Sequence, residues 1–356
     1  MAIFGTLGEN DLSAISASIA DTAVDVFVYD TSRDSDGGAW RKRTQDTSWY
    51  NETLNTTTRG SRKEFPAVAV IVATLDDVII YDGDDPDLPM WMIFESSDTG
   101  LAYETYYLGR GSGFSGYSLD LTSISMRNAT LMVGKTSGAE SNGVEVSSEI
   151  NFIKDNNLHR HTGGSNKMHD AIIDRNGGCG GYGPTETGGV VNPDINDIVM
   201  TVLPNAPIDP STGLPVPTIA VATDGGVSVI KDDGTVVDLT GSDTYVECNN
   251  VFFSDYGKLL YDNEDTSVVY EVDIPSSDIN YGGYDSTFDG RVIYPVGTHG
   301  GFSSGEIRLL GRNMSDGGKL ITKGAFAFDE NGQSEIINGL TLFDRIIGCI
   351  PLPQIN

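Results

Sequence analysis

The chain has 356 residues, 43 of them glycine, and its 51 acidic against 22 basic residues give a formal net charge of −29. This charge disfavours nucleic acid as a partner, because phosphate binding requires neutralising cations, and it disfavours insertion into an anionic membrane surface. The sequence has no apolar run long enough to cross a membrane as a helix. Its three cysteines are odd in number and far apart, which predicts free thiols and folding in a reducing cytoplasm.

One short helix is predicted near the start, where Leu12, Ile15 and Ile19 recur at helical spacing after Asp11, a potential cap. After it the pattern changes to short apolar or alternating runs bounded by Asp, Gly, Pro and Ser, which is typical of β-strands. These runs occupy 24–30, 67–74, 77–83, 90–96, 129–136, 144–155, 197–204, 218–239, 250–262, 267–275, 291–297, 306–311 and 324–338. Within 218–239, two Asp-Gly pairs between apolar positions predict tight hairpin turns.

The segments 131–155 and 219–232 share a weak pattern of apolar residues, a Gly-Val pair and an Ile-Lys-Asp triplet. A four-stranded propeller blade takes roughly 40–50 residues, so their spacing predicts two blades with a divergent one between them. The sequence therefore predicts an all-β, propeller-like assembly of roughly five to seven blades. We expect the strand at 24–30 to complete the last blade and close the ring. A multi-sheet β-sandwich with long loops is the alternative.

Three of the four histidines lie close together, at His159, His161 and His169. Imidazole rings at this spacing suit a transition metal such as zinc or iron. A fourth ligand is not evident in the sequence, and solvated histidines on a polar loop are the alternative. We predict that no transition metal is bound here.

The loop at 81–89 gathers four carboxylates, those of Asp82, Asp84, Asp85 and Asp87. Calcium binds several carboxylate oxygens from one loop, so these residues form a candidate calcium site. The spacing does not follow the EF-hand pattern, and in so acidic a chain such a cluster is more often a solvated turn. We therefore predict no cofactor, with calcium as the alternative.

The sequence offers little sign of catalysis. It contains no phosphate-binding loop with its lysine and no H-E-x-x-H helix. The many acidic residues allow any pair of carboxylates to be proposed for glycoside hydrolysis, so no pair stands out. The sequence does not predict an enzyme.

Basic residues and tryptophans concentrate between residues 33 and 63, which hold seven of the 22 basic residues and two of the three tryptophans. Arginine and tryptophan are enriched where protein surfaces meet, and on an acidic chain such a patch complements another acidic subunit. The residues we expect to form this docking interface are Trp40, Arg41, Lys42, Arg43 and Trp49. The alternative is an internal cluster of ion pairs and Trp–Arg packing within one domain.

The stretches 25–72 and 81–94 resemble the N-terminal region of predicted virion structural proteins of marine bacteriophages, often labelled tail or tail-fibre proteins. In that family a propeller-like region is often followed by a LamG-type lectin segment, and no catalytic residues are established. The residue patterns predict a helical segment at 1–23 and a propeller-like domain at 24–330. The resemblance implies that 331–356 is a linker or the start of a further, lectin-like domain.

The resulting hypothesis is a non-enzymatic virion protein of the tail or tail fibre, assembled in the host cytoplasm, that docks to the particle and presents host-binding parts. Its expected partners are other virion proteins, further copies of itself and a host-surface glycan, without nucleic acid or membrane insertion. The alternatives are a glycan depolymerase and a carbohydrate-binding module. In such a module, exposed aromatic rings would stack on sugars, and the candidates are Trp91, Tyr103, Tyr106 and Tyr107.

Overall fold

The structure is a computed structural model in which side chains and backbone can be described for most of the first 281 residues. The described residues are 13–19, 21–95, 107–108, 120–136, 145–161, 167–177, 188–241, 247–254, 257–263, 268–281, 291–295, 320–323, 326–328, 334–336 and 340–343. Among them, no helix is both long and apolar enough to cross a membrane.

The first sheet is antiparallel, with β1 (Asp25–Asp30), β2 (Val68–Ala73), β3 (Asp77–Asp82) and β4 (Met90–Glu95) in chain order. The alternation in β3 places every second side chain in the core, as its sequence predicts. The predicted short helix is present as α1 (Ser13–Ile19), and its Ile15 and Ile19 pack against Val70 and Val72 of β2. The opposite face of β2 belongs to the core shared with the second sheet.

The second sheet has five antiparallel strands in chain order. They are β5 (Asp120–Arg127), β6 (Thr130–Thr136), β7 (Glu145–Asn151), β8 (Asn156–His161) and β9 (Lys167–Asp170). Asn128 and Ala129 join β5 to β6 with left-handed backbone angles, φ 47° and 62°. Two successive left-handed residues give the turn whose twist matches a tight hairpin.

The third sheet contains β10 (Ile195–Thr201), β13 (Thr218–Thr223), β14 (Gly226–Ile230), β15 (Val236–Gly241) and the parallel edge strand β19 (Ile279–Tyr281). The two hairpins predicted from Asp-Gly pairs are confirmed, because Thr223 pairs with Gly226 and Ile230 with Val236. Between β10 and β13 the chain forms a small hairpin of β11 (Ile208–Asp209) and β12 (Leu214–Pro215).

The fourth sheet has the order β16 (Val251–Phe253), β17 (Leu259–Asn263), β18 (Val268–Val272) and β20 (Arg291–Pro295). Two further ladders follow, β21 (Leu320–Lys323) with β24 (Leu340–Phe343), and β22 (Phe326–Phe328) with β23 (Ser334–Ile336). β21 lies beside β1, so the last strands and the first strand are neighbours in space.

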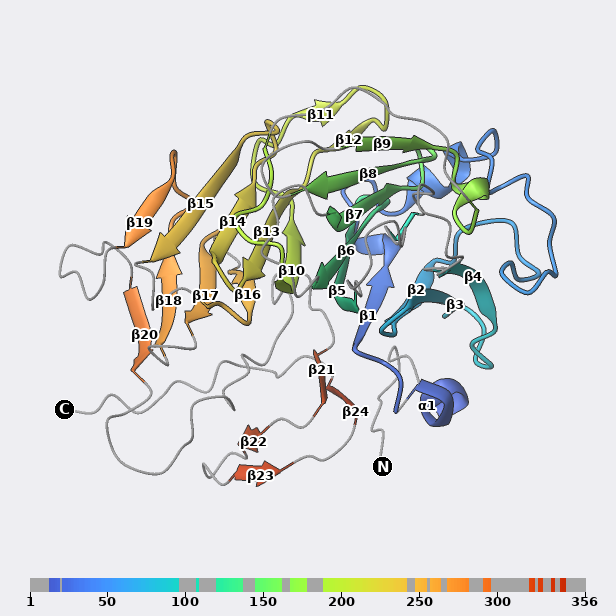
Figure 1. Ribbon diagram of the computed structural model, residues 1–356. Coiled ribbons are helices and arrows are strands. Elements are labelled where there is room, and N and C mark those ends of the chain that lie inside the picture. The colour runs from blue at the N-terminus through green and yellow to red at the C-terminus, as the bar shows by residue number, and fades with distance from the viewer. Residues whose placement is uncertain are drawn as a thin grey trace, which may run out of the picture.

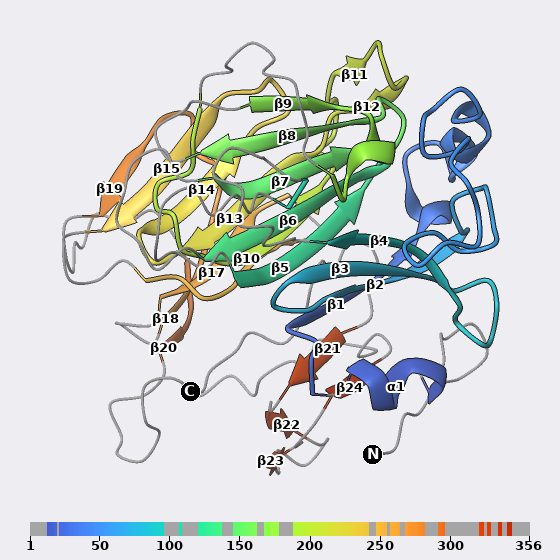
Figure 2. The ribbon, with the colours of Figure 1, turned by 45° about the vertical axis from the view of Figure 1, so that its right-hand side comes forward.

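Successive sheets lie face to face (Figures 1 and 2), and apolar side chains fill the space between them. One layer joins the first and second sheets, a second joins β6 to β10 and β13, and a third joins β13–β15 to the fourth sheet. The first strands of successive sheets are also neighbours in space: β5 contacts both β1 and β10, and β10 contacts β16. This stacking of four- and five-stranded, largely antiparallel sheets is the expected all-β, propeller-like architecture, which is confirmed.

Two details of the sequence-based prediction are wrong. The strand at 24–30 does not complete a last blade, because β1 pairs with β2 inside the first sheet. The segments 131–155 and 219–232 fall in the second and third sheets, which are successive, so no divergent blade separates them. The blade number of roughly five to seven and the domain boundaries at 23 and 330 stay predictions.

Candidate functional site

The expected docking residues lie in the long connection between β1 and β2, which we call the connecting segment (31–67). It forms two short 3₁₀ turns, η1 (Thr31–Arg33) and η2 (Ala39–Arg43), and contains no strand. Gly38 begins η2 with φ 78°, and a Cβ there would lie 2.6 Å from the Thr31 hydroxyl oxygen. The connecting segment is therefore a compact, turn-rich connection rather than an extended loop.

The two tryptophans of the connecting segment are in the core, not at a docking surface. Trp40 and Trp49 have no exposed area. The ring of Phe65 lies 5.2 Å from Trp40 and 4.8 Å from Trp91 of β4, and Trp49 lies 5.5 Å from Trp91, measured between ring centroids. The expectation that these indoles dock to another chain is wrong, and the alternative of an internal cluster describes them, because edge-to-face aromatic packing removes them from solvent.

Asp34 anchors Trp40 and the β5–β6 turn at once. Its carboxylate accepts hydrogen bonds from Trp40 Nε1 at 2.7 Å, from the Asn128 backbone N–H at 2.9 Å and from the Tyr29 hydroxyl. The Tyr29 oxygen in turn accepts the backbone N–H of Ala129. Burial raises the pKa of the Asp34 carboxyl, and the three donors oppose that rise.

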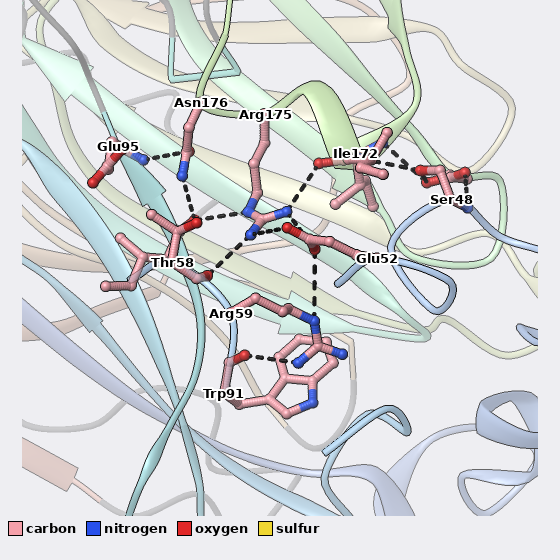
Figure 3. A network of polar contacts seen from close by, with 12 residues as sticks. Ser48, Glu52, Thr58, Arg59, Trp91, Glu95, Ile172, Arg175 and Asn176 are labelled. Carbon is pink, nitrogen blue, oxygen red and sulfur yellow. Dashed lines mark hydrogen bonds and ion pairs between the residues drawn. The ribbon is translucent and has the colours of Figure 1, made fainter. Parts of the chain in front are cut away.

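A second anchor is a buried cluster of two arginines around one glutamate (Figure 3). Arg175 pairs with both carboxylate oxygens of Glu52, at 2.8 and 3.0 Å, and Arg59 Nε lies 3.6 Å from the same carboxylate. The Arg59 guanidinium also stands over the Trp91 ring, 4.4 Å from its centroid. Burial lowers the pKa of Arg59 to about 10, with Glu52 acting against this and Arg175 adding to it, so Arg59 stays charged at neutral pH.

The same cluster covers the outer edge of β4. Arg175 donates to the backbone oxygens of Ile93 and Thr58 at 2.7 and 3.0 Å, and Gly60 N–H donates to the Trp91 oxygen. Edge strands with unpaired backbone groups invite pairing with other chains, and this edge is already occupied. Sequence reasoning missed Arg175, because it stands alone beside a glycine-rich loop and its partner Glu52 is far away in the chain.

The basic residues of η2 are divided between internal contacts and solvent. Arg41 Nε donates to the Phe65 backbone oxygen at 2.7 Å, and Arg43 bonds Asp36 and the Thr212 backbone oxygen, both at 3.0 Å. Lys42 is exposed, and within the described part of the chain its ammonium has no partner. Of the five residues expected to dock, Lys42 is therefore the one presented to solvent without an internal contact.

The candidate calcium loop is occupied by an arginine. Arg62 Nη1 contacts Asp82 Oδ1 at 2.9 Å and Asp84 Oδ2 at 2.6 Å, and Asp84 also accepts the backbone N–H groups of Ala67 and Val68. The guanidinium stands where a cation would be needed, and Asp82 and Asp84 tie the end of the connecting segment to the β3–β4 turn. The described residues contain no group of three or more acidic, His or Cys side chains arranged to hold a metal.

The histidine cluster is only partly described. His159 is buried, and its Nε2 lies 3.0 Å from the backbone oxygen of Tyr107. The same oxygen accepts Ser148 Oγ at 2.7 Å and Asn157 Nδ2 at 2.8 Å, so His159 helps to fix Tyr107 against the second sheet. The side chains of His161 and His169 lie outside the described residues, and a site shared by the three histidines is not tested.

Two of the four aromatic residues considered for sugar stacking are described, and both are buried. Trp91 and Tyr107 are 1% and 0% exposed, so their rings are not available to a glycan. Tyr103 and Tyr106 lie outside the described residues. The expected carbohydrate surface is therefore wrong for the two residues that the structure describes.

No protein-family model and no curated protein matches this chain. Among solved structures, the Chaetomium thermophilum polycomb repressive complex 2 aligns with TM-score 0.32 and 13% identity over 79% of this chain and 43% of that chain. Dihydro-heme d1 dehydrogenase NirN aligns with TM-score 0.31 and 8% identity, covering 78% and 55%. Hsv2 of Kluyveromyces marxianus aligns with TM-score 0.25 and 10% identity, covering 76% and 94%. The chain spans about half the length of the first two, and likenesses this distant carry no conclusion about function.

Proposed function

We propose that this chain is a non-enzymatic structural protein that docks to a partner protein through the outward side of the connecting segment. The observation that carries the proposal is the construction of that segment. Its aromatic rings, Arg59 and Asp34 are fixed inside, while Lys42 is held at the surface by the anchored turn around it. Ordering so long a connection costs conformational entropy, and long ordered connections in compact domains are usually functional.

We propose that this docking takes place in a bacteriophage tail or tail fibre, where the partners are other virion proteins. The resemblance of 25–72 and 81–94 to marine phage tail proteins supports this placement. A net charge of −29 supports it as well, because copies of such a chain stay apart in solution until a specific contact joins them. Docking then depends on a cation that faces a carboxylate of the partner, and the exposed Lys42 can provide that cation.

The experiment is incorporation into particles. Wild-type and K42E chains are supplied during phage growth, and their occupancy in purified particles is measured by quantitative mass spectrometry. We expect K42E to keep the wild-type melting temperature and to lose occupancy about fivefold or more, since rim charges govern association. The matched control is K258E in the fourth sheet, where Lys258 forms an exposed pair with Asp273.

Normal occupancy of the K42E chain would contradict docking through this segment. Release of reducing ends from host polysaccharide by the purified chain would instead establish a depolymerase. Binding on a glycan array without cleavage would favour the carbohydrate-binding alternative.

A further inference from the structure

The small hairpin β11–β12 reaches from the third sheet to the connecting segment. Arg43 Nη2 donates to the Thr212 backbone oxygen at 3.0 Å, next to the tip of this hairpin. Lys154, in the β7–β8 turn, pairs with Asp209 of β11 at 2.6 Å. Both views show the hairpin leaving the third sheet and extending toward the blue turns that follow β1 (Figures 1 and 2).

The β7–β8 turn also joins the connecting segment to the 3₁₀ turn η3 (Ile172–Asp174). The Asp155 carboxylate accepts the Ser48 backbone N–H at 2.6 Å and its hydroxyl at 2.8 Å, and it accepts the Ile172 N–H at 3.0 Å. The Ser48 oxygen accepts the N–H of Ile173 as well. Four segments that are far apart in the sequence therefore meet at one place, which we call the composite face (residues 42–48, 154–155, 172–174 and 208–212).

The composite face exposes apolar side chains. Among the described residues, three large hydrophobic side chains are markedly exposed, and two of them, Ile208 at 57% and Ile173 at 45%, lie on this face. Pro207 and Pro210, on either side of β11, are exposed too. Single exposed apolar residues are ordinary, but a surface that is fixed by these contacts and carries two of them suits an interface.

The composite face is also nearly neutral on a chain that is otherwise strongly acidic. Arg43 is paired with Asp36, and Lys154 with Asp209. Two exposed charges of opposite sign, Lys42 and Asp46, have no partner within the described part of the chain, and the exposed Asp174 adds one further carboxylate to this face. In a two-fold symmetric contact the same patch faces itself, so Lys42 of one copy can meet Asp46 of the other.

We infer that a second copy of this chain docks on the composite face, with Ile208 and Ile173 at the centre and Lys42–Asp46 pairs at the rim. This inference rests on the proposed docking function and names its partner. Copies with a net charge of −29 repel each other over most of their surface, so contact requires a patch where the charge is balanced and apolar area is exposed.

The test is sedimentation velocity of the full chain over a concentration series at physiological salt. The wild-type chain should populate a dimer, and I208D should raise the dimer dissociation constant about tenfold or more, because the substitution places a charge at the interface centre. The matched control is L75D, since Leu75 is 51% exposed in the β2–β3 turn, away from the composite face. L75D adds the same charge and should leave the dimer unchanged.

A charge exchange tests the symmetric pairing. K42D and D46K should each weaken the dimer severalfold, and the double variant K42D/D46K should restore it, because the exchanged charges again face each other across the two-fold axis. Equal weakening by L75D and I208D, or failure of the double variant to restore the dimer, would overturn the assignment of this face.

The outcomes also separate this inference from the proposed function. A wild-type chain that stays monomeric at every concentration overturns docking of a second copy. If K42E nevertheless lowers particle occupancy, the proposed docking function holds with a different virion protein as the partner. If K42E incorporates normally while the dimer forms as expected, the proposed particle docking fails and the self-association stands.

Discussion

The connecting segment and the hairpins β13–β15 are stabilised in different ways. In β13 and β14 every residue is buried and most are apolar, β15 buries Val237 and Leu239, the turns are short, and each strand pairs with its neighbour in the chain. The connecting segment has no strand, and it is fixed by contacts to other parts of the chain, among them Arg175, Asn128 and Phe152. The first region depends on local pairing and apolar layers, whereas the second depends on buried polar groups and an aromatic cluster that join it to distant parts of the chain.

The two regions should therefore differ in how much free energy a single substitution costs. Loss of one methyl group from an apolar layer costs a modest and local amount of free energy. Loss of one partner from a buried ion pair leaves an uncompensated charge, which is far more costly. We therefore expect single substitutions to disturb the connecting segment more than the hairpins, unless they change a turn that only glycine can form.

The largest effect is expected for R175A. It leaves the Glu52 carboxylate buried beside Arg59 alone and removes the donors to the Ile93 and Thr58 oxygens. We expect the free energy of unfolding to fall by about 5 kcal/mol, the upper end for breaking a buried pair. Denaturant unfolding measures this, with K258A as the control, because the exposed Lys258–Asp273 pair should contribute less than about 1 kcal/mol. Equal losses in the two variants would mean that the Arg175–Glu52 pair is no more costly to break than an exposed surface pair.

W49A should be nearly as damaging. Trp49 packs between Trp91 and Phe152, and its Nε1 donates to the Phe152 oxygen at 2.9 Å. Removing the indole should lower the free energy of unfolding by about 4 kcal/mol. The comparison is I219V in β13, where loss of one methyl group should cost about 1 kcal/mol. A W49A chain that melts like the wild type would mean that the indole is not in the core.

Within the hairpins β13–β15, substitutions at two glycines should differ in their cost. Gly226 has φ 121°, and a Cβ there would lie 2.2 Å from the Leu239 backbone oxygen, whereas Gly234 has φ 83° with open space around it. G226A should cost about 3 kcal/mol because strain and a backbone clash add, and G234A about 1 kcal/mol from strain alone. Thermal unfolding of the two variants side by side measures the difference, and a G234A loss as large as that of G226A would contradict it.

A smaller, pH-dependent effect is expected at Asp84. Burial raises the pKa of its carboxyl, but the Ala67 and Val68 N–H groups and the Arg62 guanidinium outweigh burial and lower the pKa overall. A carboxyl whose pKa is lower in the folded state stabilises the fold above its unfolded pKa, and that contribution disappears as the pH falls through the folded pKa.

D84N should therefore lower the free energy of unfolding by about 1 kcal/mol at pH 7. Its difference from the wild type should shrink below about pH 4, near the unfolded value for Asp. Urea unfolding across the pH range measures this. D87N, at an exposed carboxylate of the same loop, should differ from the wild type by less than about 0.5 kcal/mol.

Calcium should have the smallest effect. Because Arg62 already neutralises Asp82 and Asp84, added calcium should move the melting temperature by less than about 1 °C, since a ligand stabilises only in proportion to its binding. The control is the chain pretreated with a chelator. A larger, saturable shift would show that calcium displaces the arginine.

Much of the strand pattern follows from the sequence, but not all of it. The strands β5 and β8 were not predicted, because their sequences carry polar residues such as Ser123, Ser125, Asn157 and His159. These polar side chains are buried in the structure, and tertiary partners such as Asp197 and the Tyr107 oxygen satisfy several of them. A search for apolar alternation cannot find a strand whose interior positions are polar.

The sequence by itself determined the elements whose causes are local. Alternating apolar residues and Asp-Gly turns set β13–β15, and helical spacing of Ile15 and Ile19 set α1, because such signals act between residues close in the chain. The tertiary structure alone decided that the two tryptophans of the connecting segment point inward. It also decided that Glu52 meets Arg175 and that Arg43 meets Thr212. Those contacts join residues far apart in the chain, so their geometry exists only after the sheets have packed.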